Sequence, residues 1–386
     1  MRKVIPYGRQ EVDEDDIAAV VEVLRGDWLT TGPAVTAFEE SFASFVGASN
    51  AAAVINGTAA LHTAMLAAGI GPGDEVIVPT FTFAASANAA RYVGADVVFC
   101  DVLPDTLSID VDDAARRVTS RTKAIVPVDY SGIPCALDRV MALAEAHDLL
   151  VIEDACHAVG AIHLGRRIGS IAHLTTFSFH PVKHLTTGEG GMVTTQSEEL
   201  DARVRTLRNH GINTDFRQRE ASGTWEYDVS ELGYNFRLSD ISAALGNSQL
   251  KKVAGWVERR RELADRYREL LAPLSVRMLV EPEGVRASWH LFPVLLEGTD
   301  AERRRAAIFA SLRAAGINVN VLYRPLHQHT SFRGLPGSAG EFPVADDAYS
   351  RLIAMPMWHG LQDDEQERSA ESLAAALAAA GATPVG

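Results

Sequence analysis

Short apolar runs alternate with stretches of helical spacing along the first part of the chain. The runs have the length of buried strands and lie at 51–55, 75–79, 95–102, 122–130 and 149–154. Turns rich in glycine or polar residues follow most of them, and the helical stretches lie at 56–70, 80–94, 136–148 and 155–161. Because the strands are apolar at nearly every position, the pattern predicts a mostly parallel α/β sheet covered by helices on both faces.

Both ends of the chain add elements outside this sheet. Acidic residues open a helical stretch at 13–25 that Gly26 ends, and Pro33 suits the first turn of a second helix. The C-terminal part predicts helices at 239–274, 300–317 and 363–381, an apolar segment at 287–298 and a strand at 318–323. These elements are typical of a smaller α+β domain.

The chain length favours two domains. Its 386 residues exceed the size at which a single hydrophobic core usually stops growing. We therefore expect a large domain at 1–250 and a small C-terminal domain at 251–386, with the N-terminal segment free to pack on the small domain.

Composition narrows the function classes. The formal net charge of −14 opposes nonspecific binding to nucleic acid or anionic membranes, although a local basic pocket for a phosphorylated substrate remains compatible with it. No apolar run approaches the length of a membrane helix, and the N-terminus lacks the apolar region of a secretory signal, which predicts a soluble cytoplasmic protein. Three cysteines, Cys100, Cys135 and Cys156, lack CxxC spacing, which argues against a disulfide framework or a zinc ribbon.

Polar residues follow several predicted strands, at the edge where parallel sheets bind ligands. Thr58 lies in NGTAAL, where a helix N-terminus can hold a phosphate, although this segment also fits a simple helix cap. Asp154 ends an apolar strand, where its carboxylate needs a cation or donor; an ordinary turn aspartate is the alternative. Lys183 lies between a strand-like run containing Ser178 and the turn TTGEGG, and a surface lysine is its alternative.

The three features together are the parts that pyridoxal phosphate (PLP) requires. A helix N-terminus binds the phosphate, an aspartate keeps the pyridine nitrogen protonated, and a lysine forms the Schiff base. A partly desolvated lysine also has a lowered pKa, which makes its amine a usable nucleophile and base. The combination therefore predicts a PLP enzyme.

Five linked segments extend this prediction to a family. The chain resembles the DegT/DnrJ/StrS family of PLP-dependent nucleotide-sugar aminotransferases in the segments NGTAAL, PTFTFAASANAA, VIEDACHAVGA, FSFHPVKHLTTGEGGMVTT and LGYNFRLSDISAALG. The resemblance implies the aspartate aminotransferase-like fold, known as fold type I, with a mostly parallel central sheet. It also implies a homodimer whose active sites lie at the subunit interface.

The resemblance assigns roles to individual residues. Lys183 corresponds to the Schiff-base lysine, and Asp154 to the partner of the pyridine nitrogen. The other implied cofactor contacts are Thr58, Ala59 and Ser178 at the phosphate, Phe83 against the ring, His157 near the 3-hydroxyl, and Asn235 at the neighbouring subunit's phosphate. Phe83 also fits a plain core position, and His157 stands where many members have glutamine.

Within the family, the late segments VLYRPLH and MPMW look most like the C4-aminotransferases of pseudaminic acid biosynthesis. Those enzymes aminate a UDP-linked 4-keto-6-deoxy-N-acetyl sugar with glutamate as donor, which here predicts UDP-4-amino-4,6-dideoxy-N-acetyl-altrosamine as product. The implied substrate contacts are Tyr7, Tyr323, His327 and His329. The two histidines fit ordinary loop positions equally well, and without a third ligand nearby they do not predict a metal site.

Other functions stay open to different degrees. Another UDP-, dTDP- or GDP-linked keto sugar is an alternative acceptor, because single hydroxyl contacts decide between such substrates. A sugar dehydrase is disfavoured because it has histidine in place of Lys183, and a PLP-binding regulator is disfavoured by the lack of a basic DNA-binding stripe. GIGPGD at 69–74 lacks the third glycine of a dinucleotide-binding motif, which disfavours a dehydrogenase. No arginine stands out as the clamp for the donor's carboxylate.

Overall fold

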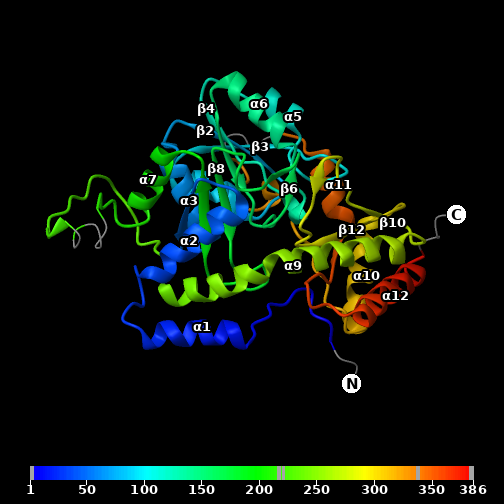
Figure 1. Cartoon of the computed structure of the whole chain (residues 1–386). Helices are drawn as coiled ribbons and strands as arrows, with labels where there is room; N and C mark the ends of the chain where they lie inside the picture. The colour runs from blue at the N-terminus through cyan, green and yellow to red at the C-terminus, as the bar shows by residue number, and fades with distance from the viewer. Residues whose placement is uncertain (1–3, 215–218, 220–221, 336–339, 382–386) are drawn as a thin grey trace.

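A seven-stranded sheet lies at the centre of the computed structural model, which describes residues 4–214, 219, 222–335 and 340–381 (Figure 1). In spatial order its strands are β1 (Asn50–Val54), β9 (Gly191–Thr195), β8 (Leu174–Ser178), β5 (Leu150–Asp154), β4 (Thr122–Ile125), β2 (Glu75–Pro79) and β3 (Asp96–Cys100). Strand β9 is antiparallel to both neighbours, and the other adjacent pairs are parallel. The sheet is mostly parallel, as predicted.

Alternate side chains of the strands pack into two hydrophobic cores, one on each face of the sheet. Ala51 and Ala53 of β1 belong to one buried cluster, whereas Ala52 and Val54 belong to the other. Helices that cover the first face are α2 (Pro33–Val46), α5 (Val111–Arg116), α6 (Leu137–His147) and part of α9 (Asp240–Leu271). Helices that cover the second face are α3 (Gly57–Ala67), α4 (Ala84–Tyr92) and α7 (Glu198–Leu207). Burial on both faces explains why the strands are apolar at nearly every position.

The N-terminal helices begin and end close to the predicted residues. Helix α1 (Glu14–Arg25) has a capping box, in which Asp13 Oδ1 accepts the Asp16 N–H at 3.1 Å and the Asp16 side chain accepts the Asp13 N–H. Helix α2 begins at Pro33 and ends at Val46, and the next residue, Gly47, has a φ of 74° that favours glycine. Helix α1 packs along α9, below the central sheet in Figure 1.

A smaller unit follows the long helix α9. It contains β10 (Val276–Met278), β12 (Phe292–Leu296) and β13 (Leu352–Met355) in an antiparallel sheet, with α10 (Ala301–Ala314), α11 (Pro343–Arg351) and α12 (Asp363–Ala379). Helix α9 extends from the central sheet to this unit (Figure 1), and residue 250 lies within it, so the domain boundary there stays a prediction. None of the helices in the described ranges is long and apolar enough to cross a membrane.

Short elements complete the architecture. Strands β6 (Ile162–His163), β7 (Arg166–Arg167) and β11 (Val285–Arg286) form a second three-stranded sheet, and the 3₁₀ turns are η1 (Tyr130–Gly132) and η2 (Leu326–Gln328). Ile5 forms a parallel bridge with Ile317. The Ile5 N–H donates to the Gly316 carbonyl and the Asn318 N–H donates to the Ile5 carbonyl, both at 2.9 Å. The N-terminal segment therefore lies against the end of α10.

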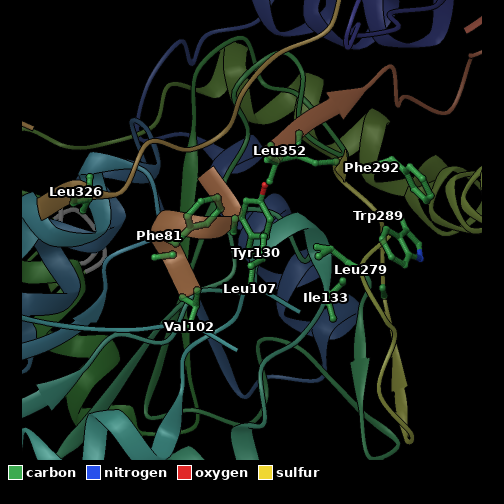
Figure 2. Close-up of a cluster of buried hydrophobic side chains, with 14 of the residues drawn as sticks. Phe81, Val102, Leu107, Tyr130, Ile133, Leu279, Trp289, Phe292, Leu326 and Leu352 are labelled. Carbon is green, nitrogen blue, oxygen red and sulfur yellow. The ribbon is translucent and has the colours of Figure 1, made fainter. Parts of the chain in front are cut away.

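A continuous apolar cluster joins the two units. Figure 2 shows Phe81 and Tyr130, which follow β2 and β4, in the same cluster as Trp289, Phe292 and Leu352 of the smaller unit. The rings of Phe81 and Tyr130 meet edge to face with centroids 5.3 Å apart. The Tyr130 hydroxyl donates a hydrogen bond to the Leu322 carbonyl, so the polar end of this buried ring is satisfied. This packing fixes residues near 322 relative to the central sheet.

Two predicted elements are absent from the structure. Residues 318–323 form no strand: Asn320 forms only an isolated bridge with Ala354, the Asn318 N–H donates to the Ile5 carbonyl, and Asn320 Oδ1 accepts the Val321 N–H at 2.8 Å. Residues 155–161 form successive turns rather than a helix, with i to i+3 hydrogen bonds from Ala158 and Ala161. The small apolar residues of this segment match a helical pattern, but they fill space beside the sheet.

One carboxylate organises the start of α2. The Asp240 side chain is fully buried and accepts the N–H groups of Gly32, Ala34 and Val35 at 2.7, 2.9 and 3.4 Å. Gly32 is the N-cap residue of α2 and has no side chain with which to cap the helix. Asp240 therefore supplies the cap from α9, and it joins two helices that are far apart in the sequence.

We predict that Asp240→Ala lowers the free energy of unfolding by about 2 kcal/mol, because it leaves three amides, two of them buried, without their acceptor. Urea unfolding followed by circular dichroism measures the change. Asp15→Ala is the matched control: Asp15 is an exposed carboxylate in the first turn of α1 and should change stability by less than about 0.5 kcal/mol. Equal effects of the two variants would contradict the assigned role of Asp240.

Candidate active site

A cavity of about 500 Å³ opens at the carboxyl ends of β1, β5 and β8. Parallel strands end at the same edge of a sheet, which brings together residues that are distant in the sequence. The predicted site residues that line the cavity are Tyr7, Thr58, Phe83, Asp154, His157, Ser178, Lys183 and Tyr323. The structure therefore gathers most of the predicted site around one space.

The N-terminus of α3 forms one end of the cavity. The first amides of a helix have no intrahelical acceptor, so the N–H groups of Gly57 and Thr58 are available to an anion. A Cβ atom at Gly57 would lie 2.8 Å from Ser178 Cβ and 3.1 Å from Ser178 Oγ, which shows how closely the serine approaches the helix. These donors and the absence of a side chain at Gly57 fit a phosphate group.

Asp154 presents a buried negative charge to the cavity. Its Oδ2 accepts a hydrogen bond from Ser86 Oγ at 2.6 Å, and its Oδ1 accepts the Cys156 N–H at 3.2 Å. Ser86 Oγ lies 2.9 Å from Thr82 Oγ1, which extends the buried chain of hydroxyl groups. Within the described ranges, no lysine or arginine forms an ion pair with Asp154, so a protonated nitrogen in the cavity is the partner that fits it.

Lys183 follows a turn after β8, in which its N–H donates to the His180 carbonyl at 2.9 Å. Its side chain lines the cavity that Asp154 also lines, and the described residues offer its amine no hydrogen bond or ion pair. Burial lowers the pKa of Lys183, while Cys156 and Asp154 oppose the shift. The neutral amine that acts as a nucleophile or base is therefore more populated than in water.

Aromatic rings form the remaining wall. The His157 and His290 ring centroids lie 4.3 Å apart, and Tyr323 Oη lies 3.3 Å from His157 Nε2. Burial, with Lys183 nearby, lowers the pKa of both histidines well below the usual range, so both rings are neutral. Phe83 is 57% exposed and lies 5.7 Å from the Tyr323 ring, which excludes the alternative of a core phenylalanine.

Four predicted contacts lie outside the cavity lining. The Ala59 N–H is already taken by Asn56 Oδ1 at 2.8 Å. His327 bridges two units of the fold, with Nδ1 2.8 Å from Thr80 Oγ1 and Nε2 3.1 Å from Asp346 Oδ1. His329 lies just after η2, and Asn235 is exposed and forms a bridge with Asn209. Their functional roles stay predictions.

Several residues of the site escaped sequence reasoning. Ser86 contacts Asp154 from within α4, and His290 reaches the cavity from the segment before β12. Nothing in the local pattern distinguishes either residue, because their positions depend on tertiary packing. Val128 also lines the cavity, just after the end of β4. Its position was a usable signal, because ligands bind beyond the carboxyl ends of parallel strands.

Comparisons with known proteins agree with this geometry. Residues 10–374 match the model of the DegT/DnrJ/EryC1/StrS aminotransferase family. The spore coat polysaccharide biosynthesis protein SpsC of Bacillus subtilis is 39% identical over 374 residues, which are 96% of each chain.

Solved structures of two aminotransferases are similar to this chain over nearly their whole length. PseC of Helicobacter pylori, an aminotransferase involved in the biosynthesis of pseudaminic acid, has a TM-score of 0.91 and 31% identity, with 98% of this chain and 100% of that chain covered. Spr1654 of Streptococcus pneumoniae, in its PLP form, has a TM-score of 0.91 and 32% identity, with 98% and 99% covered.

We predict that Ser86→Ala weakens PLP binding about tenfold, because it removes the hydroxyl donor from Asp154 Oδ2. Titration of the apoprotein with PLP, followed by absorbance, gives the dissociation constant. Ser350→Ala, which removes a hydroxyl bonded to the Asp347 carbonyl away from the cavity, should leave it unchanged. An unchanged constant in Ser86→Ala would show that Asp154 does not depend on this donor.

Proposed function

Because the chain belongs to the DegT/DnrJ/EryC1/StrS aminotransferase family, we propose that it transfers the amino group of glutamate to C4 of a UDP-linked 4-keto-6-deoxy-N-acetyl sugar. The product would be UDP-4-amino-4,6-dideoxy-N-acetyl-altrosamine. The enzyme is a PLP-dependent sugar aminotransferase of fold type I. The observation that carries the assignment is the meeting of Lys183, Asp154 and the start of α3 at one cavity.

The acceptor is the finer part of the proposal. PseC acts in pseudaminic acid biosynthesis and SpsC in that of spore coat polysaccharide, which supports a sugar acceptor of this kind. Another nucleotide-linked keto sugar is the alternative, because a single hydroxyl contact can decide between such substrates. The cytoplasmic location stays a prediction from the sequence.

The residues of the cavity would hold PLP along its length. The Gly57 and Thr58 N–H groups and the Ser178 hydroxyl suit its phosphate, and the Asp154 carboxylate suits its pyridine nitrogen. Phe83 and His157 would contact the ring. When bound, PLP supplies an electron-withdrawing ring that stabilises negative charge at the carbon next to the reacting nitrogen.

Lys183 carries the proton transfers. Its amine is held beside the site of reaction and has a lowered pKa, so it can accept a proton near neutral pH. In the first half-reaction Lys183 Nζ takes the proton from the α-carbon of glutamate. In the second it gives a proton to C4 of the sugar. Neutral His157 and the Tyr323 hydroxyl lie in hydrogen-bond contact and can orient polar groups without adding charge.

A second subunit would complete the site. The segment around 222–235 projects away from the body of the molecule (Figure 1) and exposes the large apolar side chains of Trp225, Tyr227 and Leu232, at 84%, 58% and 80%. Such a surface is typical of an interface. Asn235 is exposed on this segment, which supports a homodimer in which it reaches the cofactor phosphate of the partner subunit.

The direct test of the proposed reaction is the transfer of nitrogen. With ¹⁵N-glutamate and the UDP-linked keto sugar, we expect an aminated sugar nucleotide that carries the label, detected by mass spectrometry. Lys183→Ala should lower turnover by about a thousandfold or more, because it removes both the covalent anchor and the base. Lys123→Ala, at an exposed position of β4, is the control. Labelled product at the wild-type rate from Lys183→Ala would contradict the mechanism.

Mixing two inactive variants tests whether the site is shared. Lys183→Ala and Asn235→Ala damage opposite halves of a shared site, so a mixed dimer would have one intact site. After unfolding and refolding together, the mixture should regain about a quarter of wild-type activity, since half of the dimers are mixed and each has one intact site of two. No recovery beyond the sum of the separate variants would place Asn235 in the same subunit's site.

A further inference from the structure

Two buried carboxyl groups lie in contact beside the Asp154 strand. Glu153 directly precedes Asp154 in β5, so its side chain points to the opposite face of the sheet. Asp129 lies in the loop after β4, and its side chain is within hydrogen-bond contact of Glu153. Both residues have an exposed fraction of 0%. The mechanism described above uses neither of them.

The hydrogen bonds of the two groups leave one oxygen of each without a donor. Asp129 Oδ1 accepts the Cys135 N–H at 2.9 Å, and Glu153 Oε2 accepts the Thr175 hydroxyl at 2.8 Å. Asp129 Oδ2 and Glu153 Oε1 are buried and receive no hydrogen bond from another group of the described chain. Two carboxylates in contact cannot satisfy one another unless a proton lies between them.

Charge leads to the same conclusion. In the described part of the chain, no lysine, arginine or histidine forms an ion pair with Asp129 or Glu153. Two adjacent buried negative charges without a cation are strongly unfavourable, and one carboxyl group in such a pair binds a proton. Burial and the neighbouring carboxyl raise the pKa of Asp129 well above its usual range, and burial raises the pKa of Glu153 to about 7.

Glu39 shows that burial alone does not raise the pKa of a carboxyl group or keep it protonated. It is only 5% exposed, but Arg205 Nη1 lies 2.7 Å from its Oε2, and Arg208 also pairs with it. Burial favours a raised pKa at Glu39, yet Arg208 and Arg205 lower the pKa below its usual value. Glu39 is therefore a buried carboxylate that stays ionised, and it provides a matched control.

We propose that Asp129 and Glu153 share one proton and together act as a positioning pair for Asp154. Backbone hydrogen bonds join the loop that contains Asp129 to the end of β5. The Asp129 N–H donates to the Asp154 carbonyl at 3.1 Å, and the Asp154 N–H donates to the Pro127 carbonyl at 2.9 Å. The shared proton adds a side-chain bond across this junction. It also limits the pair to one negative charge.

The titratable groups that face Asp129 and Glu153 favour a pair that holds one proton and one negative charge. They are Asp154 and the thiols of Cys135 and Cys156. Burial raises the pKa of both thiols, so neither adds a charge at neutral pH. Loss of the shared proton would place a second negative charge close to Asp154. The role of the pair toward the cofactor rests on the proposed function, but the shared proton does not.

Infrared spectroscopy of the full-length protein tests the proton directly. The difference spectrum between wild type and Asp129→Asn/Glu153→Gln at pH 7 should contain the carbonyl band of a protonated carboxyl group, which shifts in D₂O. Glu39→Gln should give no such band in its difference spectrum, because Glu39 is ionised. A difference spectrum of the pair that contains carboxylate bands alone would overturn the proposal.

The pH dependence of unfolding keeps the proposal testable if the double variant does not fold. Because the pKa of Asp129 in the folded state is well above its ordinary value of 3.8, the folded protein holds this proton at pH values where the unfolded chain has lost it. The stabilisation by this proton is fully present below about pH 3.8 and is lost progressively as the pH rises from there to the raised pKa. Asp129→Asn, whose amide does not titrate, should remove this part of the slope. The same slope in both proteins would contradict a shared proton.

Two substitutions of Asp129 separate positioning from simple packing. The amide of Asp129→Asn can donate to Glu153 in place of the proton, whereas Asp129→Ala leaves Glu153 without that donor. We expect PLP to bind within about threefold of wild type in Asp129→Asn and about tenfold more weakly in Asp129→Ala. Equal weakening in both variants would show that the pair does not position Asp154. If PLP binds to no variant and not to wild type, the proposed function fails, while the infrared result for the proton stands.

Discussion

The end of β5 carries a negative charge that the described chain does not neutralise. Asp154 is almost fully buried and accepts hydrogen bonds from Ser86 and from the Cys156 N–H, yet no lysine or arginine among the residues that the structure describes forms an ion pair with it. A buried carboxylate without a cation is unfavourable unless a positive group is bound. The protonated pyridine nitrogen of PLP is such a group, so in the proposed function this one constraint would determine both why the cavity binds the cofactor and in which orientation.

The rest of the architecture arranges groups around that charge. The parallel strands end at one edge, so α3 presents its free amides and the turn after β8 presents Lys183 to the cavity that contains Asp154. The apolar cluster of Figure 2 packs against Tyr323, which lines the cavity. Lys183 is desolvated by the same burial, which lowers its pKa and suits it to proton transfer. Binding and chemistry therefore depend on the same packing.

Sequence reasoning found the parts of the site that follow local rules. Thr58, Asp154 and Ser178 lie at or just after the ends of apolar strands, and the β-strand pattern is sufficient to locate them. Ser86 and His290 could not be found in this way, because one lies inside a helix and the other precedes a strand, and only tertiary packing brings Ser86 against Asp154 and His290 to the cavity. The missing strand at 318–323 has a related cause. Polar and apolar residues alternate in this segment as in a strand, but the Asn320 side chain accepts the Val321 N–H that a strand would pair with a neighbour.

The most direct test of the account is the absorbance spectrum of the purified protein with bound PLP, recorded before and after glutamate and then after the UDP-linked keto sugar. We expect a visible band of the bound cofactor that glutamate removes and the keto sugar restores, because Lys183 serves both halves of the proposed reaction. A band that glutamate removes but the sugar does not restore would leave the cofactor chemistry in place and reject this acceptor. The absence of any band after added PLP would contradict the central claim that Asp154 and Lys183 form a PLP site.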